Sequence, residues 1–137
     1  MGLDYTHGHA FGLAFPSTEE TNKAGIGIIE YLLDIEIKNP ECNDVAYLGR
    51  EEYVEELDAI GVEVFAAGNL TSINPYIVFA YKGTHVSHEH WETYVEEVRA
   101  IGDHGKSAKF SEFLNKFDFR EMFPGSIIGR IVYSSVY

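Results

Sequence analysis

Two nine-residue segments of this chain are nearly identical. Residues 53–61 read YVEELDAIG and residues 94–102 read YVEEVRAIG, so seven of the nine positions agree at a spacing of 41 residues. A similar tetrapeptide precedes each copy, AYLG at 46–49 and AYKG at 80–83. Such a recurrence predicts one strand–helix module used twice, with pseudo-repeat halves at about 44–68 and 76–137.

Length and composition favour one compact domain over residues 1–137. Hydrophobic residues make up 45% of the chain, with 9 Phe and 9 Tyr, which argues against a disordered chain and for a substantial core. No apolar run reaches the length of a membrane-spanning helix. The single cysteine, Cys42, cannot form an internal disulfide, so a cytoplasmic location is expected.

The N-terminal region predicts a strand followed by a helix. Residues 4–15 alternate large and small side chains with period 2, which is typical of a strand. The small-residue face would let a helix, another backbone or a ligand come close. Ser17 and Glu20 have the spacing of a capping box, so a helix is expected to start at Thr18. Its apolar stripe contains Ala24, Ile28, Leu32 and Ile35. Gly25 and Gly27 are unfavourable in a helix interior, and residues 35–43 are expected to form a loop.

The first copy predicts a strand at 44–48, a helix at 50–60 and a strand at 62–67. The inward stripe of this helix would consist of Tyr53, Val54, Leu57 and Ile60. Gly61 is placed to end it in a left-handed conformation. A turn-rich connector at 69–75 would lead to a strand at 76–83, and the second copy predicts a helix at 88–101 that ends at Gly102.

The C-terminal region predicts one more helix and a closing strand. Residues 107–122 place four apolar side chains on one helical stripe: Phe110, Phe113, Leu114 and Phe117. This stripe is either core or an amphipathic surface for a partner or for oligomer formation. Pro124-Gly125 would end the helix, and residues 127–137 are rich in β-branched and aromatic side chains, as strands are.

The order of these elements predicts an α+β fold, an antiparallel sheet with helices on one face. Residues 44–137 would form a ferredoxin-like split βαβ pair. The N-terminal strand and helix would be an extension that joins an edge of the sheet or caps one of its faces.

Charge narrows the partners that the chain can have. The net charge is −12, and residues 1–97 hold 18 acidic and 4 basic side chains. An acidic body repels nucleic acid and anionic membranes and attracts basic surfaces. We therefore expect a basic protein surface as the partner, with no direct contact to nucleic acid or membrane.

The outer faces of the two repeat helices are rich in carboxylates, whose spacing is comparable to that of phosphates along a nucleic-acid strand. They predict a non-enzymatic binding or inhibitor protein that imitates nucleic acid, with a homo-oligomer as a further expectation. A solvated helix face is the alternative. Many small virus-encoded proteins that block host factors share this character, and a virus-encoded chain would act in the host cytoplasm. The candidate binding residues are Glu51, Glu52, Glu55, Glu56, Glu89, Glu92, Glu96 and Glu97.

A second hypothesis is a small-molecule or nucleotide site. His85-Val86-Ser87 has the form of half a two-histidine phosphoesterase motif, but His7-Gly8-His9 does not supply the second hydroxyl. Such a site would be a sequestering pocket or a modest hydrolase, and it would take an anionic ligand through Lys82 or Arg99. Its candidate residues are His7, His9, Lys82, His85, His88 and Arg99.

No motif in the sequence indicates a metal site, a cofactor or a catalytic residue. A third hypothesis is a structural subunit of a larger assembly, which would expose an apolar patch instead of a cleft.

Overall fold

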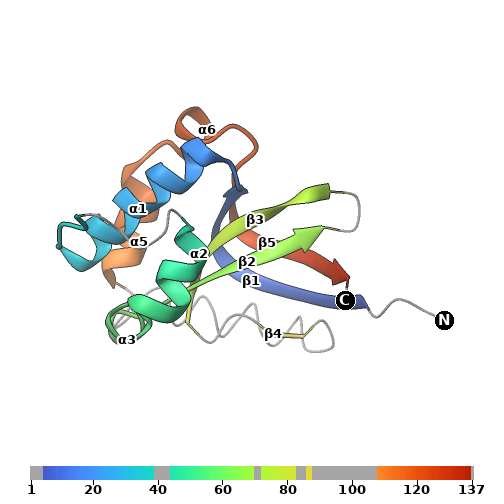
Figure 1. The fold of residues 1–137 in the computed structure, drawn as a ribbon, viewed down its shortest axis with the longest axis horizontal. Helices are drawn as coiled ribbons and strands as arrows, with labels where there is room; N and C mark the ends of the chain where they lie inside the picture. Colours follow the sequence, from blue (N-terminus) through green and yellow to red (C-terminus); the bar gives the residue numbers. More distant parts are fainter. Residues whose placement is uncertain (1–4, 39–43, 70–71, 83–85, 88–107, 137) are drawn as a thin grey trace.

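The computed structural model describes residues 5–38, 44–69, 72–82, 86–87 and 108–136. The strands are β1 (Tyr5–Pro16), β2 (Val62–Asn69), β3 (Ser72–Tyr81), β4 (Val86–Ser87) and β5 (Ile127–Val136). The helices are α1 (Glu19–Leu33), α2 (Val45–Tyr47), the π-helical turn η1 (Leu48–Glu52), α3 (Val54–Ala59), α5 (Ala108–Lys116) and α6 (Phe119–Met122). The predicted α+β class is confirmed: an antiparallel sheet has these helices packed on one face (Figure 1).

Strand β1 lies in the middle of the sheet. One of its edges pairs with β5 from Tyr5 to Ala14, and the other pairs with β3 near Pro16 and with β4 at Gly8 and His9. Strand β2 follows β3 in an antiparallel hairpin. The prediction that the N-terminal strand is an extension at an edge or over a face is therefore wrong. Strands 127–136 and 62–69 agree with the predicted ones, whereas residues 72–75, predicted as connector, already belong to β3.

The order of the strands across the sheet differs from their order in the chain. β3 lies between β1 and β2, and β1 lies between β3 and β5. The predicted split pair over residues 44–137 is wrong in its first strand, because residues 45–47 are helical. The ferredoxin-like label stays a prediction, since the second crossover passes through residues 88–107, outside the described part. The predicted helix at 88–101, its end at Gly102 and the second repeat copy also lie there.

The sheet curls until β2 and β5 approach each other, although they are not hydrogen-bonded neighbours. Its concave face buries a cluster contributed by the strands: Ala10, Ala14, Phe65, Ala67, Val78, Ala80 and Ile131. The small-residue face of β1 thus packs against the sheet itself. Gly12 is required at this curl, because a Cβ there would overlap the carbonyl oxygen of Phe79.

Helix α1 starts one residue later than the predicted capping box implies. Thr18, not Ser17, is the N-cap: its Oγ1 accepts a hydrogen bond from the Thr21 N–H at 3.1 Å, and the Oγ1 of Thr21 accepts one from the Thr18 N–H at 2.7 Å. The helix ends at Asp34, which is left-handed with φ of 54°. Ile35 therefore lies beyond the helix and is 40% exposed, not part of the stripe.

Residues 44–48 were predicted as a strand but form a helical turn. The Asp44 carboxylate accepts a hydrogen bond from the Tyr47 N–H at 3.2 Å, and the Asn22 side chain accepts one from the Val45 N–H at 3.0 Å. These contacts satisfy donors that a helix start leaves unpaired. Val45, Ala46 and Leu48 are buried against the rest of the core. A short apolar run has no periodicity that separates strand from helix.

The two tetrapeptides of the predicted repeat consequently adopt different structures. Residues 46–49 are helical or π-helical, whereas Ala80 and Tyr81 belong to β3. The strand–helix module is therefore not used twice in the predicted form.

The π-helical turn η1 shifts the phase of the following helix. The Tyr53 N–H donates to the carbonyl of Leu48 at 2.8 Å, a bond that spans five residues. The added residue rotates α3 relative to a continuous helix. Leu57 is buried, but Val54 is 43% exposed, so its predicted inward orientation is wrong. Gly61 has φ of 74° and ends the helix as predicted.

The helical layer buries aromatic side chains against the sheet. Phe15 of β1 stacks on Phe123 with ring centroids 4.5 Å apart, and Tyr81 of β3 meets Phe110 at 4.8 Å. The predicted stripe of the 107–122 helix is core at Phe110 and Phe113. The chain forms two helices there instead of one, and Gly125, with φ of 83°, follows them.

Candidate functional site: an acidic helix surface beside a hollow

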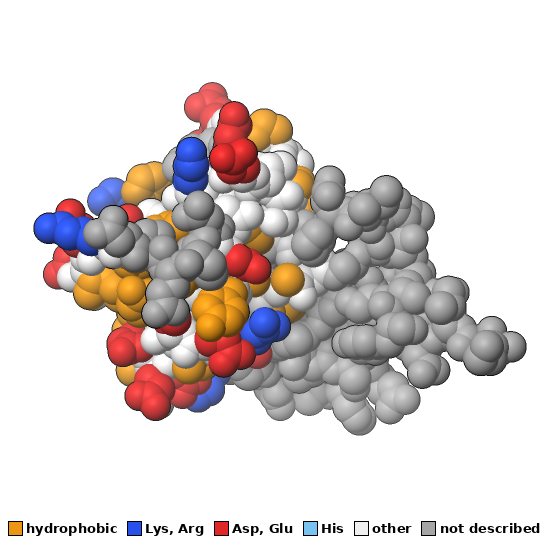
Figure 2. Space-filling view, viewed as in Figure 1, with side chains coloured by type: hydrophobic (Ala, Val, Ile, Leu, Met, Phe, Trp, Pro, Cys, Tyr) orange, Lys and Arg blue, Asp and Glu red, His pale blue; other side chains and the backbone are white. Residues whose placement is uncertain are grey.

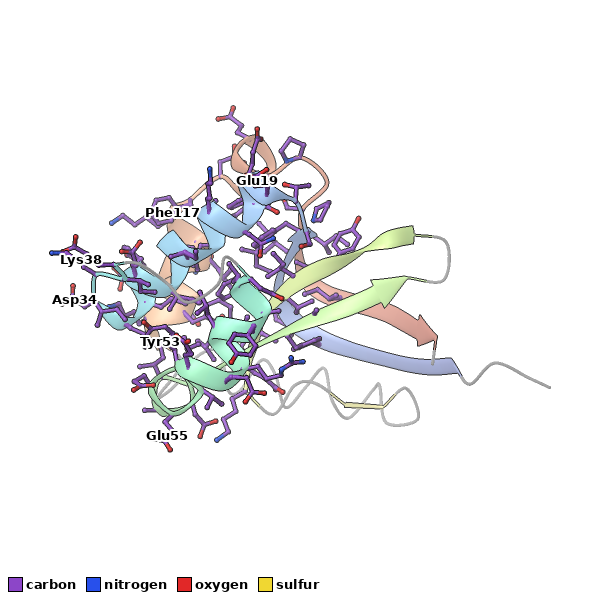
Figure 3. All side chains as sticks on the ribbon, viewed as in Figure 1. Glu19, Asp34, Lys38, Tyr53, Glu55 and Phe117 are labelled. Carbon is purple, nitrogen blue, oxygen red and sulfur yellow. The ribbon has the colours of Figure 1, made fainter. Side chains whose placement is uncertain are left out.

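Four of the predicted acidic binding residues lie on η1 and α3. Glu51, Glu55 and Glu56 are exposed, and Glu52 is half-buried. Glu55 projects away from the sheet at the far end of the helical layer from Glu19 (Figure 3). Figure 2 shows carboxylates gathered at this α3 end of the described surface, with apolar side chains among them. The predicted exposure of three of these four residues is therefore found.

The scaffold beneath these carboxylates is firmly packed. Leu48 and Leu57 are buried at 0% and 1% exposure and fix η1 and α3 on the sheet. Gly49 lies so close to β2 that a Cβ there would come 2.5 Å from the Cβ of Val64. Its lack of a side chain lets the helical backbone approach the strand. The acidic residues consequently project from a fixed surface.

Two ion pairs lie at the edge of this surface. The Lys82 Nζ lies 2.6 Å from Asp58 Oδ1, and the Arg50 Nε lies 3.6 Å from Glu51 Oε1. Both pairs are about half exposed, so each contributes at most about 1 kcal/mol to stability. The Lys82 N–H also donates to the Gly61 carbonyl at 2.9 Å, which joins the end of β3 to the end of α3.

A hollow opens between η1–α3 and β2, with a volume of about 440 Å³. Its lining is mostly apolar, with charged groups at intervals: Gly49, Arg50, Val54, Asp58, Val62, Glu63, Val64, Phe65 and Lys82. Neither this hollow nor the place of Val54 in it is predicted from the sequence. The outward position of Val54 depends on the π-helical turn, for which the sequence offers no recognisable signal.

For the histidines of the predicted site, the structure describes only the backbone of His7 and His9. His7 and His9 lie on β1, and His9 pairs with Val86 of β4, next to Ser87 of the H-x-S segment. The side chains of His7 and His9 lie outside the described part, as do His85, His88 and Arg99. Lys82 is paired with Asp58 and faces the hollow. A shared histidine cleft stays a prediction.

The second half of the predicted acidic surface also lies outside the described residues. It comprises Glu89, Glu92, Glu96 and Glu97. The two acidic helices therefore cannot be placed side by side, and the joint carboxylate surface stays a prediction.

Within the described ranges, no cluster of three or more His, Cys, Asp or Glu side chains has a geometry that could hold a metal ion. Among the helices of those same ranges, none combines the length and apolar character needed to cross a membrane. Comparisons of the chain with protein-family models, with curated proteins and with solved structures found no match.

Proposed function

We propose that this chain is a binding protein that engages a basic surface of another protein through the acidic residues of η1 and α3. The observation that carries the proposal is the exposure of Glu51, Glu55 and Glu56 on a helical segment whose opposite side is buried. Packing against the core does not require carboxylates at these positions. Their number and exposure fit recognition of Lys and Arg side chains.

The fixed scaffold favours such recognition. Because Leu48 and Leu57 hold the segment against the sheet, its backbone would lose little conformational freedom when a partner binds. Exposed carboxylates also raise the association rate with a basic partner by electrostatic steering, an effect that salt weakens. The partner should therefore bind fast at low salt and more weakly as the ionic strength rises.

The test compares two charge-reversed variants. Glu55→Lys/Glu56→Lys alters the proposed surface, and Glu19→Lys/Glu20→Lys is its matched control. Each pair consists of two consecutive exposed glutamates in the first turn of a helix. Lysines there oppose the helix dipole by similar amounts, about 0.3–1 kcal/mol each. The net charge changes equally in both variants.

The assay is capture from lysate at low and high salt, followed by association kinetics with the captured protein. The wild type and the Glu19/Glu20 control should capture the same salt-sensitive partner, and Glu55→Lys/Glu56→Lys should lose it. If both variants lose the partner equally, only total charge matters and the proposed surface is wrong. If both retain it, the acidic residues of α3 are not the binding site.

A further inference from the structure

The segment formed by η1 and α3 has two sides with different charge balance. On the side next to β2, Asp58 shares the lining of the hollow with Arg50 and Lys82. Glu63 of β2 is the remaining charged residue of that lining, so its positive and negative side chains balance. This side therefore offers little net attraction to a cation.

The other side keeps its negative charge. Glu55 and Glu56 are exposed and lie outside the lining of the hollow, and Glu55 projects away from the sheet (Figure 3). Among the residues that the structure describes, no Lys or Arg forms an ion pair with either of them. A basic partner thus meets the unneutralised carboxylates here.

Two cations of the chain itself hold neighbouring carboxylates of the segment. The Lys82 Nζ lies 2.6 Å from Asp58 Oδ1, and the Lys82 N–H donates to the Gly61 carbonyl at 2.9 Å, which ties the lysine to the end of α3. The Arg50 Nε lies 3.6 Å from Glu51 Oε1. Both pairs are about half exposed, so a partner's cation can reach them.

These internal pairs change what a partner gains by binding. A partner's lysine that contacts Asp58 must displace Lys82, and this exchange replaces one exposed ion pair by another of similar strength. A lysine that contacts Glu55 or Glu56 forms a pair without breaking one to a described residue. The net gain is therefore larger at these two glutamates.

We infer that Lys82 and Arg50 are internal competitors that confine the cations of a basic partner to Glu55 and Glu56. This inference rests on the proposed function and names the residues that set the extent of its binding surface. Removing either cation should enlarge that surface, because the carboxylate that it holds becomes available to the partner.

The affinity test uses hexalysine with an acetylated and an amidated end, titrated calorimetrically into the full chain. At low salt Lys82→Gln should tighten binding about two- to fivefold more than its control does, the range expected from one additional exposed ion pair. The control is Lys23→Gln, which makes the same charge change at an exposed lysine of α1 that has no ion pair with a described residue. Arg50→Gln should act in the same direction as Lys82→Gln. These differences should vanish at high salt.

NMR of the side-chain carboxylate carbons locates the bound peptide. In the wild type, hexalysine should shift the signals of Glu55 and Glu56 and leave that of Asp58 nearly unchanged. In Lys82→Gln the Asp58 signal should shift as well. Glutamine at position 82 keeps the backbone bond to Gly61, so the end of α3 stays in place.

Two results would overturn this inference while the acidic surface still stood. One is equal tightening by Lys82→Gln and Lys23→Gln, which would show that only net charge matters. The other is a wild-type shift at Asp58 as large as those at Glu55 and Glu56, which would show that Lys82 does not compete.

A different result would refute the proposed function as well. If hexalysine shifts Glu55 and Glu56 of the wild type no more than Glu19 and Glu20, the carboxylates of α3 have no preference for cations over those of α1. The acidic surface would then be wrong, and with it the competition inferred for its edge.

Discussion

The two glycines of helix α1 should respond to alanine in opposite ways. Gly25 is buried against Val45, and a Cβ there would lie 2.8 Å from Cγ2 and 3.0 Å from Cγ1 of that side chain. Val45 is fully buried and β-branched, so it has little freedom to move away. Gly27 is exposed, and a Cβ there would meet nothing within 4 Å.

The magnitudes follow from these contacts. Alanine in place of glycine gains about 1 kcal/mol in a helix interior, and Gly27→Ala should show that gain in full. At Gly25 the same gain is opposed by an overpacking cost of about 1–3 kcal/mol. Gly25→Ala should therefore be neutral or destabilising by up to about 2 kcal/mol. The two variants should differ by about 1–3 kcal/mol in the free energy of unfolding.

Urea unfolding followed by far-ultraviolet circular dichroism measures both values. A double-mutant cycle with Val45→Ala isolates the contact: in that background Gly25→Ala should no longer cost stability, which would give a coupling energy of about 0.5–3 kcal/mol. Gly27→Ala should show no coupling to Val45. If Gly25→Ala stabilises the wild type as much as Gly27→Ala does, α1 does not pack against Val45 and the reasoning is refuted.

Three further changes test other parts of the fold by the same unfolding measurement. Gly12→Ala should destabilise by more than about 3 kcal/mol, because its Cβ overlaps the Phe79 backbone; a folded variant of unchanged stability would contradict the curl of the sheet. Thr18→Ala should cost about 1 kcal/mol through loss of the N-cap, and no cost would mean that the cap lies elsewhere. Lys82→Met should cost less than about 1 kcal/mol, because the ion pair with Asp58 is half exposed; a larger loss would show that this pair is shielded from water.

The sequence predicted elements best where the signal is local. The alternation in residues 4–15 identified β1, and the glycine at position 61 marked the end of α3 with its left-handed conformation. Its predictions failed where a contact distant in sequence decides the outcome. Residues 45–47 are helical partly because Asn22, on another helix, accepts the Val45 N–H.

The candidate surface also has one part that local sequence predicts and one part that depends on contacts between distant segments. The exposure of Glu51, Glu55 and Glu56 followed from the sequence, since carboxylates seldom lie in a core. The hollow did not, because it needs Val54 turned outward by the π-helical turn and Val64 brought from β2 to face it. No spacing within one segment contains that information.

By itself, the sequence determined which segments near the ends form strands, where one helix stops and which residues carry charge at the surface. Each of these depends on periodicity, glycine or polarity within a few residues. Only the tertiary structure decided that β1 is central, pairing with β5 from the other end of the chain, and that the curled sheet buries its own small-residue face. Strand order and curl are set by contacts between distant segments, and those contacts also place an apolar hollow beside the acidic helix.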